Sequence, residues 1–263
     1  MAVIGHPVAH SLSPLMHGAA LKAKGINGAC LAFDVTDPGG AIHGMRALGI
    51  TGFSVTIPHK EAVIPYLDEL DPDAEAIGAV NTIINRNRKL TGYNTDAFGA
   101  RTALEEKTVI RGKRTAVIGA GGAARAILHA VIQAGGEAAV VNRTRERGER
   151  LAAEMGAVFL SGEELAAFSP EILINTTSVG MTPRIDESPV PASVFRTGMT
   201  VMEIIYTPPS TRLLKEARQK GARGINGLSM FVYQGARQFE LFTGSTAPVE
   251  TMRCAVHNFY TTC

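Results

Sequence analysis

A lysine and an aspartate, each just beyond an apolar segment, are the residues best suited to chemistry in this chain. Lys60 closes the segment Ser-Val-Thr-Ile-Pro-His-Lys at 54–60, and Asp96 closes Gly-Tyr-Asn-Thr-Asp at 92–96. An ammonium group beside a carboxylate can donate a proton to a forming alcohol and take it back. Taken singly, the lysine would be a solvated charge and the aspartate a helix N-cap. Together they predict a general acid–base pair.

Several hydroxyl and amide side chains also lie at the ends of apolar segments or just before a predicted helix. Ser11 and Ser13 are separated by one apolar residue just before a predicted helix. Helix capping accounts for Ser13 and leaves Ser11 unexplained. Thr56 ends an apolar run, and Asn81 begins another. Ligands collect at the carboxyl ends of strands in open α/β sheets, so these residues predict a small polar substrate there.

A glycine-rich turn joins a predicted strand to a predicted helix at 119–124. Its sequence, Gly-Ala-Gly-Gly-Ala-Ala, matches the GxGxxG/A pattern of dinucleotide-binding folds. The first glycine permits the tight turn, and the second lets the backbone approach a pyrophosphate at the helix N-terminus. Such a turn can also serve packing alone, but the complete strand–turn–helix–strand unit favours the binding site. The predicted cofactor contacts are Gly119, Ala120, Gly121, Gly122 and Ala123.

The residues after the next strand predict which dinucleotide is bound. An NAD site usually has Asp or Glu here, which binds the ribose 2′-hydroxyl. This chain instead has Asn142, Arg143 and Thr144, followed by Arg147. A guanidinium group pairs with a 2′-phosphate, whereas basic residues at the start of an ordinary helix oppose the helix dipole. We therefore expect NADP rather than NAD.

Composition narrows the class of protein. The chain has 263 residues, of which 45% are hydrophobic, and a net charge of +2, which argues against a nucleic-acid binder. Cys30, Cys254 and Cys263 have neither disulfide-framework nor metal spacing, so we expect a reducing cytoplasm. His6 and His10 lack an acidic or cysteine partner at ligand spacing, so no metal site is expected. The N-terminus does not resemble a signal peptide, and no apolar run is long enough for a membrane span.

Apolar periodicity and turn residues predict an α/β chain with alternating strands and helices. The expected strands are Val3–Ile4, Cys30–Val35, Phe53–Ile57, Asn81–Ile84, Leu90–Tyr93, Thr115–Ile118, Ala138–Val141, Ala157–Leu160, Ile172–Ile174 and Thr200–Ile205. The expected helices are one between Ser13 and Gly25, Ala41–Leu48, Lys60–Tyr66, Ala97–Glu106, Gly122–Ala134 and, as the last long one, about Met230–Phe242. This alternation is typical of parallel sheets covered by helices.

The motifs resemble those of the shikimate dehydrogenase family. The substrate motifs of that family are similar to residues 6–14, 54–61, 78–82 and 94–96, and its cofactor motifs to residues 119–123, 142–144, 175–181 and 227–230. The similarity runs in order from residue 5 to about residue 238. It implies an N-terminal α/β substrate domain at 1–101, completed by 229–263, and a doubly wound Rossmann NADP domain at 102–228. It also implies an active site in the cleft between them.

The same resemblance assigns roles to individual residues. It implies Lys60 and Asp96 as the catalytic pair, with Ser11 and Ser13 binding the substrate carboxylate. Its implied contacts to the hydroxyls and ring of shikimate or 3-dehydroshikimate are Thr56, Asn81 and Gln234, with Tyr206 as a further substrate contact. Its implied residues at the nicotinamide end of NADP are Ile204, Gly227 and Met230.

Two departures from the family pattern keep alternatives open. Ser54 stands where many members have asparagine, and Glu203 stands where aspartate is frequent. Ser54 leaves the choice between shikimate and quinate open, so a quinate/shikimate dehydrogenase, with NAD in place of NADP, is the first alternative. A methylenetetrahydrofolate dehydrogenase would not need the paired hydroxyls Ser11 and Ser13. A non-catalytic NADP-binding regulatory module would not need Lys60 and Asp96. We expect a monomer or homodimer without nucleic-acid or membrane partners.

Overall fold

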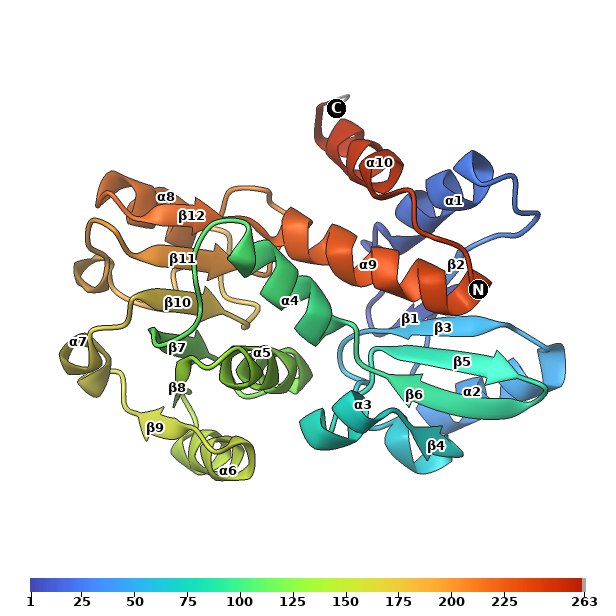
Figure 1. The fold of residues 1–263 in the computed structure, drawn as a ribbon, viewed down its shortest axis with the longest axis horizontal. Helices are drawn as coiled ribbons and strands as arrows, with labels where there is room; N and C mark the ends of the chain where they lie inside the picture. The colour runs from blue at the N-terminus through green and yellow to red at the C-terminus, as the bar shows by residue number, and fades with distance from the viewer. Residues whose placement is uncertain (262–263) are drawn as a thin grey trace. The chain divides into compact units, whose positions relative to one another are not determined.

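The computed structural model describes residues 1–261, which form two compact units (Figure 1). Unit 1 comprises Met1–Phe98 and the segment from Val232 onwards, and unit 2 comprises Gly99–Phe231. Both crossings lie inside helices, α4 (Asp96–Glu105) and α9 (Gly227–Thr243). The domain limits predicted from the sequence, after residues 101 and 228, fall in these same two helices. Cys263 lies outside the described residues.

Unit 1 contains a mixed sheet with the order β2-β1-β3-β5-β6-β4. Its strands are β1 (Ala2–Gly5), β2 (Leu31–Asp34), β3 (Gly52–Val55), β4 (Glu69–Leu70), β5 (Thr82–Arg86) and β6 (Lys89–Tyr93). Strand β5 runs antiparallel to both β3 and β6, while the other pairs are parallel. The predicted polar turn makes the β5–β6 hairpin, because Asn87 and Arg88 adopt the positive φ angles of 54° and 68° that a two-residue turn requires.

Helices α2 (Pro38–Leu48) and α3 (Pro72–Ile77) enclose, together with this sheet, a core that contains Ile4, Ile42, Phe53, Ile83 and Leu90. The other helices of unit 1 are α1 (Ser13–Ala23), the C-terminal part of α9, and α10 (Val249–Thr261). The short helical stretch predicted from Lys60 to near Tyr66 is present only in its last part: turns lead to a 3-10 helix at Ile64–Tyr66, since Pro65 has no backbone N–H for a regular helix.

Helix α10 was not predicted, because α9 was expected to be the last long helix. Gly244, with φ +71°, ends α9, and α10 then packs against α1. Its buried residues include Met252 and Val256, which lie four positions apart on one face. That narrow apolar stripe is a weak periodic signal in the sequence.

Unit 2 is the doubly wound domain that the sequence predicted. Its six strands are all parallel, in the order β12-β11-β10-β7-β8-β9, so the chain order reverses between β7 and β10. These strands are β7 (Arg114–Ile118), β8 (Glu137–Val141), β9 (Val158–Leu160), β10 (Ile172–Asn175), β11 (Thr200–Glu203) and β12 (Arg223–Ile225). Dinucleotides bind at such a switch point, outside the carboxyl ends of the strands.

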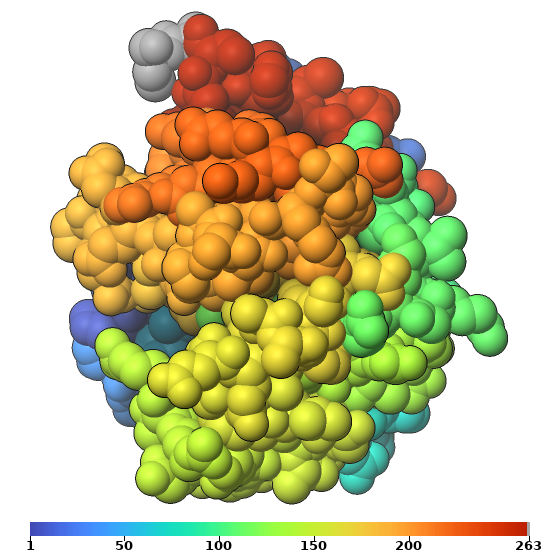
Figure 2. Space-filling view, turned by 90° about the vertical axis from the view of Figure 1, so that its left-hand side faces the viewer, coloured from blue at the N-terminus to red at the C-terminus, as the bar shows by residue number. Residues whose placement is uncertain are grey.

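The helices of unit 2 are α4, α5 (Gly122–Gln133), α6 (Arg145–Met155), α7 (Glu164–Phe168), α8 (Arg212–Gln219) and the start of α9, with a 3-10 turn at Ala192–Val194. Segments coloured yellow-green to orange pack closely on the face shown in Figure 2. Among residues 1–261, no helix combines the length and apolar character that crossing a membrane requires.

Candidate active site

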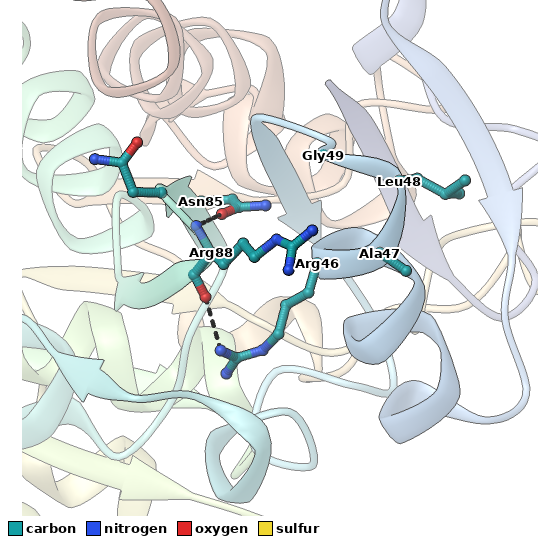
Figure 3. A pocket seen from close by; sticks show the side chains of 7 residues that line it. Arg46, Ala47, Leu48, Gly49, Asn85 and Arg88 are labelled. Carbon is teal, nitrogen blue, oxygen red and sulfur yellow. Dashed lines mark hydrogen bonds between the residues drawn. The ribbon is translucent and has the colours of Figure 1, made fainter.

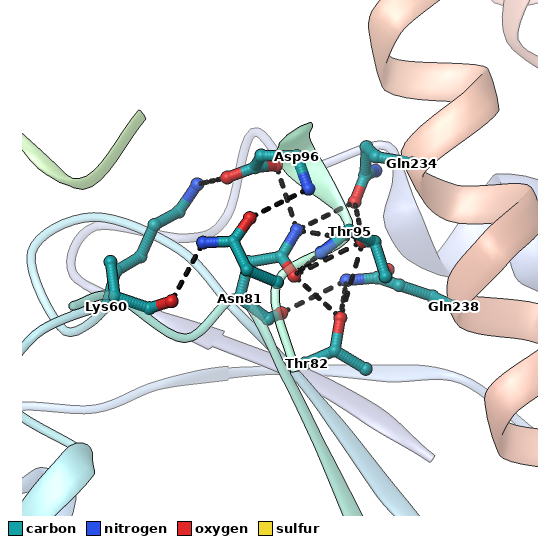
Figure 4. Close-up of polar contacts among 9 residues, drawn as sticks. Lys60, Asn81, Thr82, Thr95, Asp96, Gln234 and Gln238 are labelled. Atoms are coloured by element: carbon teal, nitrogen blue, oxygen red, sulfur yellow. Dashed lines mark hydrogen bonds and ion pairs between the residues drawn. The ribbon is translucent and has the colours of Figure 1, made fainter. Parts of the chain in front are cut away.

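Lys60 and Asp96 form a direct ion pair in unit 1 (Figure 4). Lys60 lies in the turn that follows β3, and its carbonyl accepts a hydrogen bond from Val80 N at 2.7 Å. Asp96 is the first residue of α4. The two side chains are only 15% and 7% exposed, so solvent screens this pair far less than a surface pair. The structure thus brings together the two groups that the sequence suggested for proton transfer.

The Asp96 carboxylate is available because another residue makes the turn at the start of α4. Asn94 Oδ1 accepts the N–H of Asp96 at 3.0 Å, and Asn94 Nδ2 donates to Ala79 O at 2.8 Å. A simple capping interpretation would assign this local side-chain contact to Asp96. In the structure Asn94 makes it instead. Both carboxylate oxygens of Asp96 remain directed at other side chains.

Asn81 donates to the carboxylate oxygen that Lys60 does not occupy. Its Nδ2 lies 2.8 Å from Asp96 Oδ1, while Lys60 Nζ binds Asp96 Oδ2. The orientation of the Asn81 amide follows from its oxygen atom, because Asn81 Oδ1 accepts the backbone N–H of Thr95 at 2.7 Å. Asn81 is 2% exposed, and its Nδ2 also lies 3.4 Å from Gln234 Oε1. Four predicted residues, Lys60, Asn81, Asp96 and Gln234, thus form one cluster.

Three further members of this cluster were not singled out in the sequence: Thr82, Thr95 and Gln238. Thr82 Oγ1 donates to Asn81 Oδ1 at 2.8 Å, and Gln238 Nε2 donates to Thr82 Oγ1 at 2.9 Å. Gln238 lies four residues after Gln234, so both amides lie on one face of α9. Two glutamines at that spacing beside buried apolar residues were the available signal.

The other predicted substrate residues of unit 1 are not hydrogen-bonded to this cluster. Ser11 Oγ accepts the N–H of Ser13 at 3.3 Å, so Ser11 makes the turn contact at the start of α1 and Ser13 does not. The expectation that Ser13 caps the helix was wrong, because α1 begins at Ser13 itself and its N-cap position is Leu12, which has no capping side chain. Thr56 is half-buried directly after β3, and its backbone N–H donates to Ile4 O at 2.9 Å.

The glycine-rich turn of unit 2 has the form of a phosphate cradle. Gly119 has φ +117°, and a Cβ there would lie 2.5 Å from Thr176 Oγ1, so this position requires glycine. At Gly121, the N-cap of α5, no side chain caps the helix and an added Cβ would meet nothing within 4 Å. Free N–H groups with open space before them fit the diphosphate of a dinucleotide. Ala120, Gly122 and Ala123, the other predicted contacts, are half-buried in this turn.

The arginines after β8 differ in their contacts. Arg147 Nε donates to Ala120 O at 3.0 Å, which ties α6 to the glycine-rich turn. Arg145 pairs with Glu149 at 2.7 Å and lies over the ring of Phe159. Arg143 is exposed and, within the described chain, makes no hydrogen bond or ion pair. Asn142 Nδ2 donates to Thr144 O at 2.8 Å, which shapes the loop between β8 and α6.

The residues expected at the nicotinamide end lie in unit 2, and two of them, Ile204 and Gly227, pack against each other. A Cβ on Gly227 would lie 2.4 Å from Ile204 O, so only glycine lets the start of α9 approach the end of β11 this closely. Tyr206 stacks on Phe231 with the ring centroids 4.5 Å apart. Met230 is 6% exposed and precedes Phe231 on the same helix. The sequence-distant residues Ile204 and Gly227 are thus in direct contact.

The Glu203 side chain accepts hydrogen bonds from Ile205 and Thr211, which belong to the segment that carries Tyr206. Its carboxylate is fully buried and accepts from Asn175 Nδ2 at 3.0 and 3.1 Å, from Thr211 Oγ1 at 3.0 Å and from Ile205 N at 3.1 Å. Burial raises the pKa of Glu203 to about 7, even though these hydrogen bonds act in the opposite direction.

This raised pKa predicts a pH dependence of stability. Between about pH 4.5 and about pH 7 the folded chain retains a proton that the unfolded chain has lost, so the contribution of Glu203 is greatest below this window and is lost as the pH rises through it. We expect the free energy of unfolding of the wild type, relative to Glu203→Gln, to fall across this window in urea titrations. The exposed Glu146→Gln is the control. A difference that does not vary with pH would contradict the assignment.

Two other features of the described chain do not add to this site. No group of three or more His, Cys, Asp or Glu side chains within residues 1–261 is placed to hold a metal ion. A pocket of about 360 Å³ lies at the end of α2 and the β5–β6 turn (Figure 3). There the Arg46 guanidinium donates to Arg88 O at 2.7 Å and pairs with Asp68 at 3.0 Å, so that arginine is already engaged.

Segments of both units match known protein families. Residues 3–83 match the shikimate dehydrogenase substrate binding domain, residues 101–202 match shikimate / quinate 5-dehydrogenase, and residues 227–257 match the shikimate 5'-dehydrogenase C-terminal domain. A relative from Moorella thermoacetica, named shikimate dehydrogenase (NADP(+)), is 48% identical over 266 residues, which cover 96% of this chain and 90% of that protein.

Solved structures show the same similarity. A shikimate dehydrogenase crystallised in complex with NADP+ has a TM-score of 0.94 at 44% identity, covering 98% of this chain and 94% of that one. The shikimate 5-dehydrogenase from Thermus thermophilus in complex with NADP(H) and shikimate has a TM-score of 0.91 at 39% identity, covering 98% of both chains. These identities extend over nearly the whole length, and the chain therefore belongs to the shikimate dehydrogenase family.

Proposed function

We propose that the chain catalyses the NADP-dependent, reversible reduction of 3-dehydroshikimate to shikimate. The observation that carries this proposal is the buried Lys60–Asp96 pair, with Asn81 donating to the second oxygen of Asp96. The names of the relatives, which specify shikimate and NADP(+), support the same substrate and cofactor. A regulatory module that only bound NADP would have no use for a proton-donating pair.

The pair supplies the proton of the reaction. NADPH, when bound, supplies the hydrogen and two electrons that reduce the carbonyl carbon. Lys60 donates a proton from its ammonium group to the carbonyl oxygen, so that a neutral alcohol forms, and takes a proton from that alcohol in the reverse direction. Asp96 holds Lys60 in place and accepts from the substrate hydroxyl. Burial of both side chains keeps water from replacing the substrate as the proton partner.

Hydroxyl groups in unit 1 are proposed to bind the rest of the substrate. Ser11 Oγ accepts the N–H of Ser13, so the hydroxyl hydrogen of Ser11 remains free to donate to a carboxylate. Ser13 is proposed as the second donor to that carboxylate. Thr56, Asn81 and Gln234 are proposed to contact the hydroxyls and the ring, and Tyr206 is proposed to contact the substrate from the other unit.

The dinucleotide is proposed to lie on the turn at 119–123, with Asn142, Arg143, Thr144 and Arg147 around the 2′-phosphate of its adenosine. Ile204, Gly227 and Met230 are proposed for its nicotinamide end. The cytoplasm is the proposed compartment, since Cys30 and Cys254 are free thiols, and a monomer or homodimer is the proposed state.

Arg143→Ala tests the preference for NADP. Loss of one charge-assisted contact with a phosphate weakens binding by about 1.5–3 kcal/mol, so we expect the KM for NADP to rise roughly 10–100-fold while the KM for NAD changes little. Arg150→Ala, which removes an equally charged and exposed side chain from α6, is the control. An equal rise in both KM values would contradict the 2′-phosphate assignment.

The proposed function itself is tested by turnover measured side by side on shikimate and quinate, each with NADP and with NAD. We expect the highest kcat/KM for shikimate with NADP. A preference for quinate or for NAD would favour the quinate/shikimate dehydrogenase alternative. NADP binding without any turnover would favour a regulatory module.

A further inference from the structure

Gln238 is a buried amide on α9 whose hydrogen-bonding capacity is fully used. Its side chain is 2% exposed. Nε2 donates to Thr82 Oγ1 at 2.9 Å and to Asn81 O at 3.1 Å (Figure 4). Oε1 accepts from Ser54 Oγ at 2.8 Å and from His17 Nε2 at 3.4 Å. An amide offers two donors and two main acceptor positions, so these four partners determine its orientation.

The two side chains that face Gln238 Oε1, Ser54 and His17, both act as hydrogen-bond donors. Burial lowers the pKa of His17 to about 4, so its ring is neutral and carries one N–H. Among residues 1–261 no partner lies within hydrogen-bond distance of its Nδ1, and its Nε2 faces an acceptor oxygen, so the proton is on Nε2. Ser54, on β3, donates its hydroxyl hydrogen to the same Oε1 of Gln238. The amide orientation is fixed from its other side, because the backbone carbonyl of Asn81 can only accept, so Nε2 lies toward Asn81 and Thr82 and Oε1 faces His17 and Ser54.

This orientation determines the direction of the next hydrogen bond. Because Gln238 donates to Thr82 Oγ1, the single hydroxyl hydrogen of Thr82 must point to another acceptor. That acceptor is Asn81 Oδ1, 2.8 Å away. Asn81 Oδ1 is thereby surrounded by donors, and Asn81 Nδ2 is directed at Asp96 Oδ1. A chain of donors thus runs from His17 and Ser54 through Gln238, Thr82 and Asn81 to the carboxylate that binds Lys60.

We propose that Gln238 is a positioning residue for the reaction, which directs the Asn81 amide at Asp96 by donating to Thr82 and Asn81. The proposal rests on the proposed function of the Lys60–Asp96 pair. Gln238 acts through other side chains and contacts neither Lys60 nor Asp96. The role of Ser54, where many family members have asparagine, is then to bind Gln238 rather than the substrate.

Two substitutions of Gln238 separate positioning from space filling. Gln238→Leu keeps the volume and removes every hydrogen bond. Gln238→Glu keeps the shape and the acceptor oxygen but replaces the donor that faces Thr82. We expect both to lower kcat roughly 3–30-fold, which corresponds to the loss of one or two neutral hydrogen bonds, with the KM for NADP within about twofold of the wild type. Arg237→Ala, on the exposed side of α9, should leave kcat unchanged.

Thr82→Val gives a second test that leaves α9 intact. It removes the hydroxyl through which Gln238 acts, so we expect the same fall in kcat, and the double variant with Gln238→Leu should lose little more than either single variant. The positioning role is overturned if Gln238→Glu retains wild-type kcat, or if the losses from Thr82→Val and Gln238→Leu add fully. Wild-type protein without turnover on shikimate would instead overturn the proposed function, so the two failures are distinguishable.

Discussion

Replacing Lys60 by alanine is expected to lower kcat roughly 10²–10⁴-fold, the usual contribution of general acid–base catalysis. Lys60 is the cation paired with Asp96, and it is proposed to supply the proton that neutralises the forming alkoxide. Its removal leaves the carbonyl oxygen without a donor in a site where water is scarce. Steady-state kinetics with shikimate and NADP measure the loss.

The fold and the binding of NADP should survive the loss of Lys60, because the glycine-rich turn lies in the other unit. Calorimetric titration with NADP checks this independently of turnover. Lys89→Ala is the matched control, since it removes a lysine that forms an exposed pair with Glu69 at 2.5 Å, and such pairs contribute little. Normal turnover in Lys60→Ala would exclude Lys60 from the mechanism.

Replacing Asp96 by asparagine is expected to lower kcat by about 10²–10³-fold. The two carboxylate oxygens have different partners, Asn81 at Oδ1 and Lys60 at Oδ2. An amide has only one acceptor atom, so it can accept from one of these donors and must direct its own N–H groups at the other. The ammonium of Lys60 would then lose its partner or Asn81 would turn away, and either change disturbs proton transfer.

The control for Asp96→Asn is the same substitution at the exposed Asp186 of unit 2. The affinity for NADP should stay within about twofold of the wild type in both variants, since the expected loss lies in the chemical step. A variant at position 96 with unchanged kcat, or one whose only defect is weaker NADP binding, would contradict the assigned role.

Features that depend on neighbouring residues were predicted well from the sequence. The βαβ unit with its glycine-rich turn was predicted correctly, because the requirement for glycine at Gly119 arises from the local backbone, φ +117°. The β5–β6 hairpin follows in the same way from the polar turn that contains Asn87 and Arg88. Helix α10 was missed because its narrow apolar stripe needs α1 as a packing partner before it becomes a stable helix.

The sequence could not predict which of two nearby polar side chains makes the turn contact before a helix. Ser11 rather than Ser13 makes the turn contact before α1, and Asn94 rather than Asp96 makes it before α4. In each pair both residues can form such a bond, with small differences in energy. The packing of the surrounding chain decides which one forms it, and so decides which side chain stays available for a ligand.

By itself, then, the sequence determined the class of fold, the dinucleotide turn and the residue types that could transfer a proton, since each depends on residues close together in the chain. Only the tertiary structure decided that Lys60 meets Asp96, 36 positions away, and that Gln238 meets Asn81, 157 positions away. These contacts depend on the strand order β3-β5-β6 and on the return of α9 to unit 1. The physical reason is that a buried polar group must find a partner wherever the packed core places one, and local sequence does not specify that place.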